Sequence, residues 1–222
     1  MEMSLGRKLL MDWAELTFSV MVSDADETYD PSLSPENIAL SIADKKNHAV
    51  QTQLGEYFKE HILIAADTIV VLNNKIIGKP KNREAAIEIL TLLSGKIHEV
   101  ITAVNLRSQN SNRIIECKAL VSFKKLNEKE IIDYVEEFKP LDKAGAYGAQ
   151  ECLPSGYNPC SDLEKMFLKR IGSPHLFEQS RATSANPAKP MEAIKAIKGS
   201  YFNVMGLPIH LIYDYVSEFV GE

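Results

Sequence analysis

The sequence contains little cysteine, histidine or tryptophan, and it has no long apolar run. Among its 222 residues are one tryptophan, five histidines and three cysteines, Cys117, Cys152 and Cys160. No C-x-x-C pair occurs, and so few thiols in a chain of this length favour reduced, intracellular cysteines over a disulfide or metal role. No stretch reaches the ~18 apolar residues of a membrane-spanning helix, and the first residues lack the apolar region of a signal peptide. We therefore expect a cytoplasmic protein that does not bind a membrane.

Several well-known site motifs are also missing. There is no G-x-x-x-x-G-K-[ST] phosphate loop, no G-x-G-x-x-G dinucleotide fingerprint and no H-E-x-x-H zinc motif. The formal net charge is −5, which argues against the extended basic face that nucleic-acid binding requires. A local basic pocket for a small anion remains compatible with this composition.

The composition is otherwise that of a globular protein of ordinary size. Apolar residues make up 45% of the chain and charged residues 25%, and a chain of this length buries enough surface to fold without disulfides. Helical and strand patterns alternate along it, which predicts an α/β fold built on a mixed sheet. Helices are predicted at residues 4–15, 34–50, 82–95, 127–138 and 208–219, and strands at 18–22, 62–72, 98–108, 113–126 and 199–206.

The character of the chain changes at residues 151–198. This stretch is rich in Pro, Ser, Asn and Gly, and it contains one helix-like piece at residues 163–171. An irregular connection of such length is unusual inside a compact domain. We interpret it as a mostly irregular surface insertion in a single domain that spans residues 1–222.

One acid and three lysines are the residues that could carry chemistry. Asp67 lies inside the apolar run AADTIVV, where a carboxylate must be paired, hydrogen-bonded or bound to a cation; alternatively, it ends the strand and caps a turn. Lys46, Lys79 and Lys143 are each ordinary surface residues when taken alone. Together with the neighbouring glycine-rich segments they indicate a pocket for an anion such as phosphate.

Five motifs in a fixed order give a more specific indication. They resemble the motif series of the Maf family (septum formation protein, nucleoside triphosphate pyrophosphatases): AADTIVV, GKP, LSGKIHEVITAV, DKAGAYGAQ and IKGSYFNVMGLP. The resemblance implies a fold similar to inosine triphosphate pyrophosphatases, with a mixed elongated sheet, flanking helices and two lobes around a cleft. It also implies hydrolysis of a nucleoside triphosphate to the monophosphate and pyrophosphate, with a divalent cation, Mg²⁺ or Mn²⁺, as cofactor.

The segment DKAGAYGAQ distinguishes between branches of this family. With its final glutamine it resembles the dTTP/UTP pyrophosphatases, and modified nucleotides are further candidate substrates. A 7-methyl-GTP pyrophosphatase, which carries a different segment here, is one alternative. A catalytically weakened nucleotide-binding regulator linked to cell division is another. We expect the small residues of the segment to form a pocket wall, with the Gln150 amide at the edge of a pyrimidine.

The resemblance also assigns roles to individual residues. Asp67 corresponds to the proton acceptor and, with Glu27, to a metal ligand, while the lysines neutralise charge on the leaving pyrophosphate. A homodimer is left open as a partner besides the nucleotide. The site residues implied are Arg7, Glu27, Lys46, Asp67, Thr68, Lys79, Lys143 and Gln150.

The start of the chain departs from the family pattern. The family has an apolar strand that ends in Ala-Ser-x-Ser-Pro-Arg-Arg, and here only Ser4 and Arg7 match, with Leu5 and Gly6 between them. The three residues before Ser4 are fewer than the ~5–6 of a typical strand. We therefore expect no full first strand, and we expect Arg7 near the start of the first helix, facing the cleft with Lys79.

Overall fold

A five-stranded antiparallel sheet forms the centre of the computed structural model, which describes residues 4–174 and 191–221. The strand order is β2-β1-β3-β4-β5, and every neighbouring pair is antiparallel. The predicted α/β fold with helices around an elongated sheet is confirmed, but the described strands form no parallel pair, so the sheet itself is not mixed. The strands are β1 (Leu63–Leu72), β2 (Lys75–Ile77), β3 (Ile97–Arg107), β4 (Asn112–Phe123) and β5 (Ile194–Gly199).

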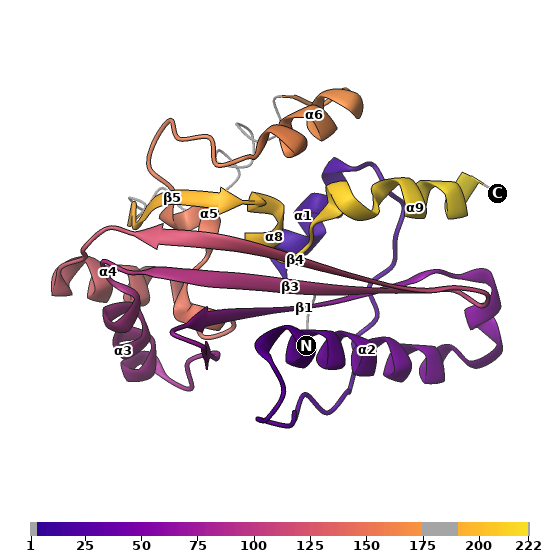
Figure 1. Ribbon diagram of the computed structural model, residues 1–222, viewed down its shortest axis with the longest axis horizontal. Helices are drawn as coiled ribbons and strands as arrows, with labels where there is room; N and C mark the ends of the chain where they lie inside the picture. The colour runs from indigo at the N-terminus through magenta and orange to yellow at the C-terminus, as the bar shows by residue number, and fades with distance from the viewer. Residues whose placement is uncertain (1–3, 175–190, 222) are drawn as a thin grey trace.

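Helices cover both faces of this sheet (Figure 1). The α-helices are α1 (Leu5–Trp13), α2 (Pro35–Leu54), α3 (Arg83–Leu93), α4 (Glu128–Phe138), α5 (Ala149–Cys152), α6 (Asp162–Arg170), α8 (Tyr201–Val204) and α9 (Ile209–Gly221). Two 3₁₀ helices, η1 (Gly55–Glu60) and η2 (Ala144–Ala146), complete the described elements.

Alternation along the strands determines which helices each face receives. Ile69 of β1 and Ile101 of β3 pack with Ala39 and Ala43 of α2 on one face. Their strand neighbours, such as Val70, point to the opposite face and join the main core, to which α1, α8 and α9 contribute. Figure 1 shows α2 along one side of the sheet and α1, α8 and α9 on the other. Successive residues of β1 therefore face different helices, as a strand period of two requires.

Most predicted helices and hairpins form because their end signals are strong. Ser34 accepts a hydrogen bond from the backbone of α2, with Pro35 at its first position, and Asn127 forms a complete capping box with Glu130 at α4. The β1–β2 turn places Asn73 and Asn74 at φ 50° and 60°, the left-handed conformation that a two-residue hairpin loop needs.

Two predicted strands are wrong. Residues 18–22 form no strand, and Val20, Met21 and Val22 are 48%, 41% and 43% exposed; an alternating pattern gives a strand only where a partner strand supplies hydrogen bonds. Residues 199–206 also differ, because β5 ends at Gly199 and Ser200 caps the short helix α8. Capping by the Ser200 side chain outweighs the strand preference of the aromatic residues that follow.

The interpretation of residues 151–198 as a surface insertion also needs correction. The predicted helix is present as α6, and β5 pairs with β4, but much of the described segment belongs to the main hydrophobic cluster. The apolar residues were too few and too scattered in the sequence to show this. The Ser- and Pro-rich part at residues 175–190 lies outside the described residues. In the described part of this segment, the apolar residues that are 5% exposed or less are Cys152, Leu153, Cys160, Phe167, Leu168, Ala193 and Ile194.

The three cysteines are unpaired thiols, as predicted. Cys152 and Cys160 are buried, and burial raises the pKa of the Cys160 thiol to about 12. Since only the thiolate is a strong nucleophile or metal ligand, Cys160 acts as a small core residue.

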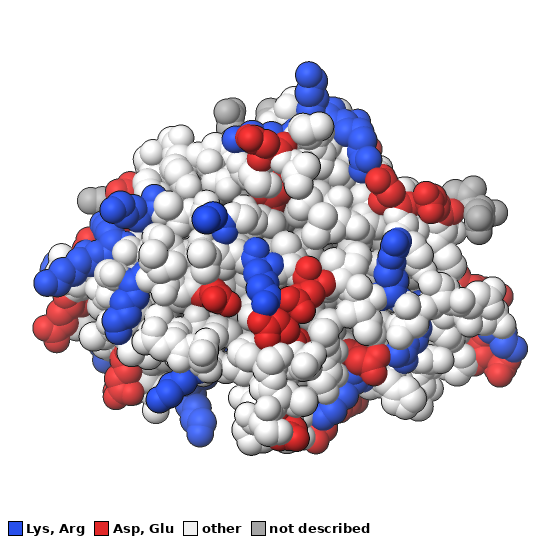
Figure 2. Space-filling view, in the orientation of Figure 1, with Lys and Arg blue, Asp and Glu red and all other residues white. Residues whose placement is uncertain are grey.

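The surface carries charges of both signs. On the face drawn in Figure 2, basic and acidic side chains are interspersed and often adjacent. Within residues 4–174 and 191–221, no helix has the length and apolar character needed to cross a bilayer.

Candidate functional site

Asp67 lies on β1 where that strand forms the edge of the sheet. β2 pairs with β1 only at residues 70–72, so the described part of the sheet ends at β1 beside Asp67. The residue is the fifth of ten in β1, which excludes the alternative that it ends the strand and caps a turn. Its side chain is 13% exposed, so its carboxylate needs a partner.

Lys46 of α2 supplies this partner. Its Nζ lies 2.6 Å from Asp67 Oδ1 and 3.0 Å from Glu27 Oε1. Lys46 follows Ala39 and Ala43 at helical spacing, which places it on the face of α2 that packs on the sheet. One ammonium group therefore pairs with both carboxylates, and Asp67 has the partner that the sequence predicted for an acid in an apolar strand.

Positive charges keep the second of these carboxylates ionised. Burial alone would raise the pKa of Glu27, but the hydrogen bond and charge of Lys46, with the charges of Lys79 and Arg7, lower it overall. The structure thus brings Arg7, Lys46 and Lys79 to one acidic pair, as expected from the sequence for a charge-rich site.

Arg7 occupies the first turn of α1, where the sequence predicted it. Its Nε donates to Gly206 O at 2.8 Å, and one terminal nitrogen donates to Thr68 Oγ1 at 3.1 Å. Burial lowers the pKa of Arg7, while the charges of Asp67 and Glu27 act in the opposite direction. Residues 1–3, for which the sequence predicts no full strand, lie outside the described residues.

Gly6 permits this arrangement through its size. A Cβ atom at position 6 would lie 2.6 Å from Met205 O, which is shorter than real Cβ contacts allow. The close approach of α1 to the turn after α8 therefore requires glycine at this position. The same turn includes Gly206 at φ +100°, whose carbonyl oxygen accepts the Arg7 hydrogen bond.

The hydroxyl groups behind Arg7 form a chain with a defined direction. Thr102 Oγ1 donates its proton to Asn203 O at 2.8 Å, so it must accept in its 2.9 Å contact with Thr68 Oγ1. Thr68 then donates to Thr102 and accepts from Arg7. Hydrogen bonds aligned in this way strengthen one another.

Asn203 anchors the chain to β3. Its side-chain oxygen accepts from Thr102 N at 3.0 Å, and its amide nitrogen donates to Val100 O at 2.8 Å. Asn203 and Thr102 are 0% exposed, so every one of these bonds is shielded from water. Sequence reasoning missed Thr102, Asn203 and Gly206; a buried amide inside the apolar motif SYFNVMG was the available signal.

The segment DKAGAYGAQ packs closely on β1, and its role as a pocket wall stays a prediction. Gly145 has φ +73°, and a Cβ there would lie 3.0 Å from Val70 Cγ2. Its N–H donates to Gly78 O at 3.3 Å, next to Lys79. Ala146 and Tyr147 are buried in the main core. The small residues of the segment thus serve close packing beside the Lys79 loop.

Within the described residues, the structure shows no direct link from Gln150 or Lys143 to the acidic pair. Lys143 Nζ bonds to Asp142 Oδ1 at 3.0 Å. In the described part of the chain, no hydrogen bond joins Gln150 or Lys143 to Asp67 or Thr68. The backbone near Gln150 is held by Tyr134, whose hydroxyl accepts from Gly148 N and donates to Glu151 Oε2. The roles of Gln150 and Lys143 in specificity and substrate binding stay predictions.

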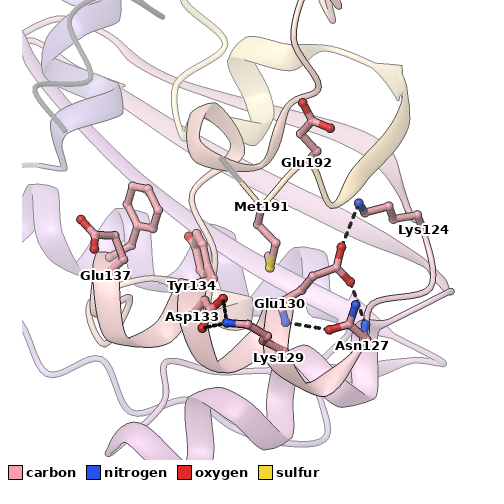
Figure 3. Close-up of a pocket in the computed structure, with 10 residues that line it drawn as sticks. Lys124, Asn127, Lys129, Glu130, Asp133, Tyr134, Glu137, Met191 and Glu192 are labelled. Atoms are coloured by element: carbon pink, nitrogen blue, oxygen red, sulfur yellow. Dashed lines mark hydrogen bonds and ion pairs between the residues drawn. The ribbon is translucent and has the colours of Figure 1, made fainter. Parts of the chain in front are cut away.

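A separate hollow of about 560 Å³ lies along α4 (Figure 3). Its charged side chains are largely paired with each other, as in Lys124–Glu130 at 3.2 Å and Lys129–Asp133 at 2.7 Å. None of the residues around Asp67 contributes to its lining. Because Lys124 and Lys129 are each paired with a carboxylate of α4, nothing in the described lining of this hollow marks it as a site for an anion.

The described residues contain no group of three or more His, Cys, Asp or Glu side chains placed to hold a metal ion. Asp67 and Glu27 nevertheless present two carboxylates to one cation, Lys46. Hard oxygen donors of this kind suit Mg²⁺ or Mn²⁺, and Mg²⁺ is commonly held by one or two carboxylates together with substrate phosphates. The donor set therefore fits a metal that arrives with a phosphorylated substrate.

His98 gives the fold a pH dependence that can be measured. Its ring is 1% exposed, with Nε2 2.8 Å from the Tyr147 hydroxyl, and burial lowers its pKa from 6.5 to about 4. Between these values the unfolded chain binds a proton that the folded chain does not. We expect His98 to cost about 3 kcal/mol of unfolding free energy as the pH falls from 6.5 to 4.

Urea unfolding of His98→Gln across this pH range checks the expectation. The variant should lose about 3 kcal/mol less than the parent protein between pH 6.5 and pH 4. His48→Gln, which changes an exposed histidine on α2, should keep the parental pH dependence. Equal pH dependence of all three proteins would show that His98 has the same pKa in the folded and the unfolded chain.

Comparisons with known proteins agree on the family. The sequence profile described as "Maf-like protein" matches residues 3–155, which is more than half of the chain. A protein from Porphyromonas gingivalis named dTTP/UTP pyrophosphatase is 34% identical to this chain, over 97% of this chain and 90% of that protein. A protein of the same name from Bacteroides fragilis is 38% identical, over 93% of this chain and 88% of that protein. One from Bacillus cereus is 34% identical over 96% and 90%. The resemblance drawn from the five motifs is confirmed: this chain belongs to the Maf-like protein family.

Proposed function

We propose that this protein hydrolyses dTTP and UTP to the nucleoside monophosphate and pyrophosphate. The observation that carries the proposal is the position of Lys46 between Asp67 and Glu27, whose carboxylates also interact with the charge of Arg7. Three relatives with this activity in their names align over more than nine-tenths of the chain. The carboxylates of this pair are suited to positioning water, and the cations around them are suited to neutralising phosphate charge.

The chain's own residues account for the chemistry in this proposal. The Asp67 carboxylate accepts a proton from the water that attacks the α-phosphorus. A new P–O bond forms as the bond from the α-phosphorus to the bridging oxygen breaks, and pyrophosphate leaves. Lys46, Lys79 and Arg7 neutralise the charge that develops on the phosphate oxygens. A divalent metal, Mg²⁺ or Mn²⁺, would be held by Asp67 and Glu27 and would polarise those oxygens further.

The hydrogen-bonded hydroxyl groups of Thr68 and Thr102 favour a nucleobase that has an N–H group at its edge. Thr68 donates its only proton to Thr102 and accepts from Arg7, which leaves one lone pair for a ligand. Thymine and uracil present an N3–H donor between two carbonyl acceptors. Thr68 could accept from this donor, and the Gln150 amide could serve a carbonyl.

Incubation with dTTP, UTP and 7-methyl-GTP tests the proposal. Each nucleotide is supplied with Mg²⁺ or Mn²⁺, and pyrophosphate and monophosphate are measured together. We expect release from dTTP and UTP at higher kcat/KM than from 7-methyl-GTP. Preference for 7-methyl-GTP would favour the sister activity, and tight nucleotide binding without release would favour a regulator. A cytoplasmic location and a homodimer stay predictions.

Replacing Gln150 with glutamate tests its part in base recognition. The change exchanges an amide that donates and accepts for a carboxylate that only accepts. Loss of one well-placed hydrogen bond to a polar base edge costs about 1–3 kcal/mol, so we expect the kcat/KM for dTTP and UTP to fall by about 10- to 100-fold. The preference over 7-methyl-GTP should shrink as well.

A charge-matched control accompanies this variant. Gln53→Glu introduces the same charge at an exposed position of α2 and should leave the substrate preference unchanged. If Gln150→Glu keeps the parental ratio of dTTP to 7-methyl-GTP turnover, another residue reads the base.

A further inference from the structure

Glu164 is a buried carboxylate far along the chain from the residues that hold the acidic pair. It lies in the first turn of α6 and is 0% exposed. It also lies beyond residue 155, where the match to the Maf-like profile ends. A carboxylate buried to this degree is costly unless each oxygen is well hydrogen-bonded.

The Glu164 carboxylate accepts five hydrogen bonds. Oε1 accepts from Ser200 Oγ at 2.7 Å and from Phe202 N at 2.6 Å. Oε2 accepts from Tyr201 N at 3.2 Å and from both the backbone and the hydroxyl of Ser161, at 2.7 and 2.8 Å. One carboxylate thus connects the start of α6 to the start of α8.

These bonds satisfy the N-terminus of α8, which has four residues. The first N–H groups of any helix lack partners within the helix, and a negative charge there is favourable. Ser200 Oγ donates to Glu164 and accepts from Asn203 N at 2.9 Å. Glu164 therefore orients Ser200, and Ser200 fixes the turn that carries Asn203.

Asn203 continues this network to the candidate site. Its backbone oxygen and its side-chain amide both bond to Thr102, which accepts from Thr68, which in turn accepts from Arg7. Gly206, just after α8, accepts the second Arg7 bond. We propose that Glu164 is a positioning residue that sets the placement of Arg7 and Thr68 through α8.

Packing alone does not account for this residue. Phe167 of the same helix already packs α6 against α8 and α9, with ring centroids 6.3 Å from Phe202 and 5.3 Å from Tyr213. Glu164 adds no apolar contact of that kind, and three of its five bonds end on the start of α8. Its contribution is the orientation of α8.

Glu164→Gln tests this placement, and the kinetic part of the test rests on the proposed pyrophosphatase activity. An amide keeps the size of the carboxylate but replaces one acceptor oxygen with a donor that faces N–H and O–H groups. Because small displacements of binding groups cost up to ~100-fold in rate, we expect kcat/KM for dTTP to fall about 10- to 100-fold. Asp162→Asn, on the same helix with a side chain 98% exposed, should keep parental kinetics.

A double-mutant cycle with Thr102→Val distinguishes transmission through the network from a separate effect. Thr102→Val removes the hydroxyl between Asn203 and Thr68. If Glu164 acts through this chain, the double variant loses about as much activity as the more affected single variant. Multiplied losses, or parental kinetics of Glu164→Gln, would overturn the proposal.

Hydrogen exchange supplies a readout that does not depend on activity. In folded Glu164→Gln, amides of α1 and of the centre of β3 should exchange faster than in Asp162→Asn, and unchanged protection of both would overturn the proposal. If Glu164→Gln does not fold, Ser200→Ala replaces it in both experiments under the same criteria. If the parent protein releases no pyrophosphate from dTTP or UTP, the proposed function fails, and the exchange result alone tests the positioning role.

Discussion

Asp67→Asn is expected to lower the turnover of dTTP and UTP by about 100-fold or more while the protein stays folded. Asparagine has nearly the same size, so the strand geometry should persist. Its amide, however, cannot accept the proton of the attacking water, and it is a weaker ligand for a divalent cation. It also leaves Lys46 with Glu27 as its remaining carboxylate partner. The kcat from pyrophosphate release and the thermal unfolding midpoint are measured together.

The control for this variant is Asp133→Asn. Asp133 is an exposed acid on α4 that pairs with Lys129, and it should keep parental kcat and unfolding midpoint. An Asp67→Asn protein that retains kcat within about twofold would remove Asp67 from proton transfer and metal binding. Loss of activity together with loss of cooperative unfolding would instead assign Asp67 a structural role.

Phe167→Ala is expected to lower the free energy of unfolding by about 3–5 kcal/mol. The ring is 5% exposed and packs edge-on against Phe202 and Tyr213. Its removal leaves a cavity between α6, α8 and α9 that these helices cannot easily close. Urea denaturation followed by circular dichroism gives the difference in unfolding free energy.

Met166→Ala is the matched control on the same helix. Met166 is 68% exposed, and truncating it should change stability by about 0.5 kcal/mol or less. If Phe167→Ala were equally mild, α6 would be a surface appendage, as the composition of residues 151–198 suggested. A large difference between the two variants would establish that this segment is part of the folded core.

The sequence predicted those parts of the fold whose signals are local. β1 is apolar except at Asp67 and Thr68, α2 and α4 have strong caps, and β3 and β4 are joined by a short polar turn. Each element follows from periodicity and end signals that act within a few residues. The strand predicted at residues 18–22 failed because strand formation depends on a partner elsewhere in the chain.

The candidate site, like the fold, was predictable only where local signals in the sequence define it. A carboxylate in an apolar strand must have a partner, so Asp67 and a nearby lysine could be inferred from residue types alone. That Lys46 serves both Asp67 and Glu27 depends on the packing of α2 against β1. No local pattern fixes which of several lysines meets which acid.

The sequence by itself determined the family, the order of the elements and the need to neutralise Asp67, because each depends on residue type and local spacing. The tertiary structure alone showed that residues 161–164, 200–206 and 102 form one buried hydrogen-bonded network with Arg7. It also showed that the segment after Gln150 is part of the core. These hydrogen bonds join residues up to 199 positions apart. Because the groups are buried, each of them needs a hydrogen-bond partner, since an unpaired group loses its hydration without compensation.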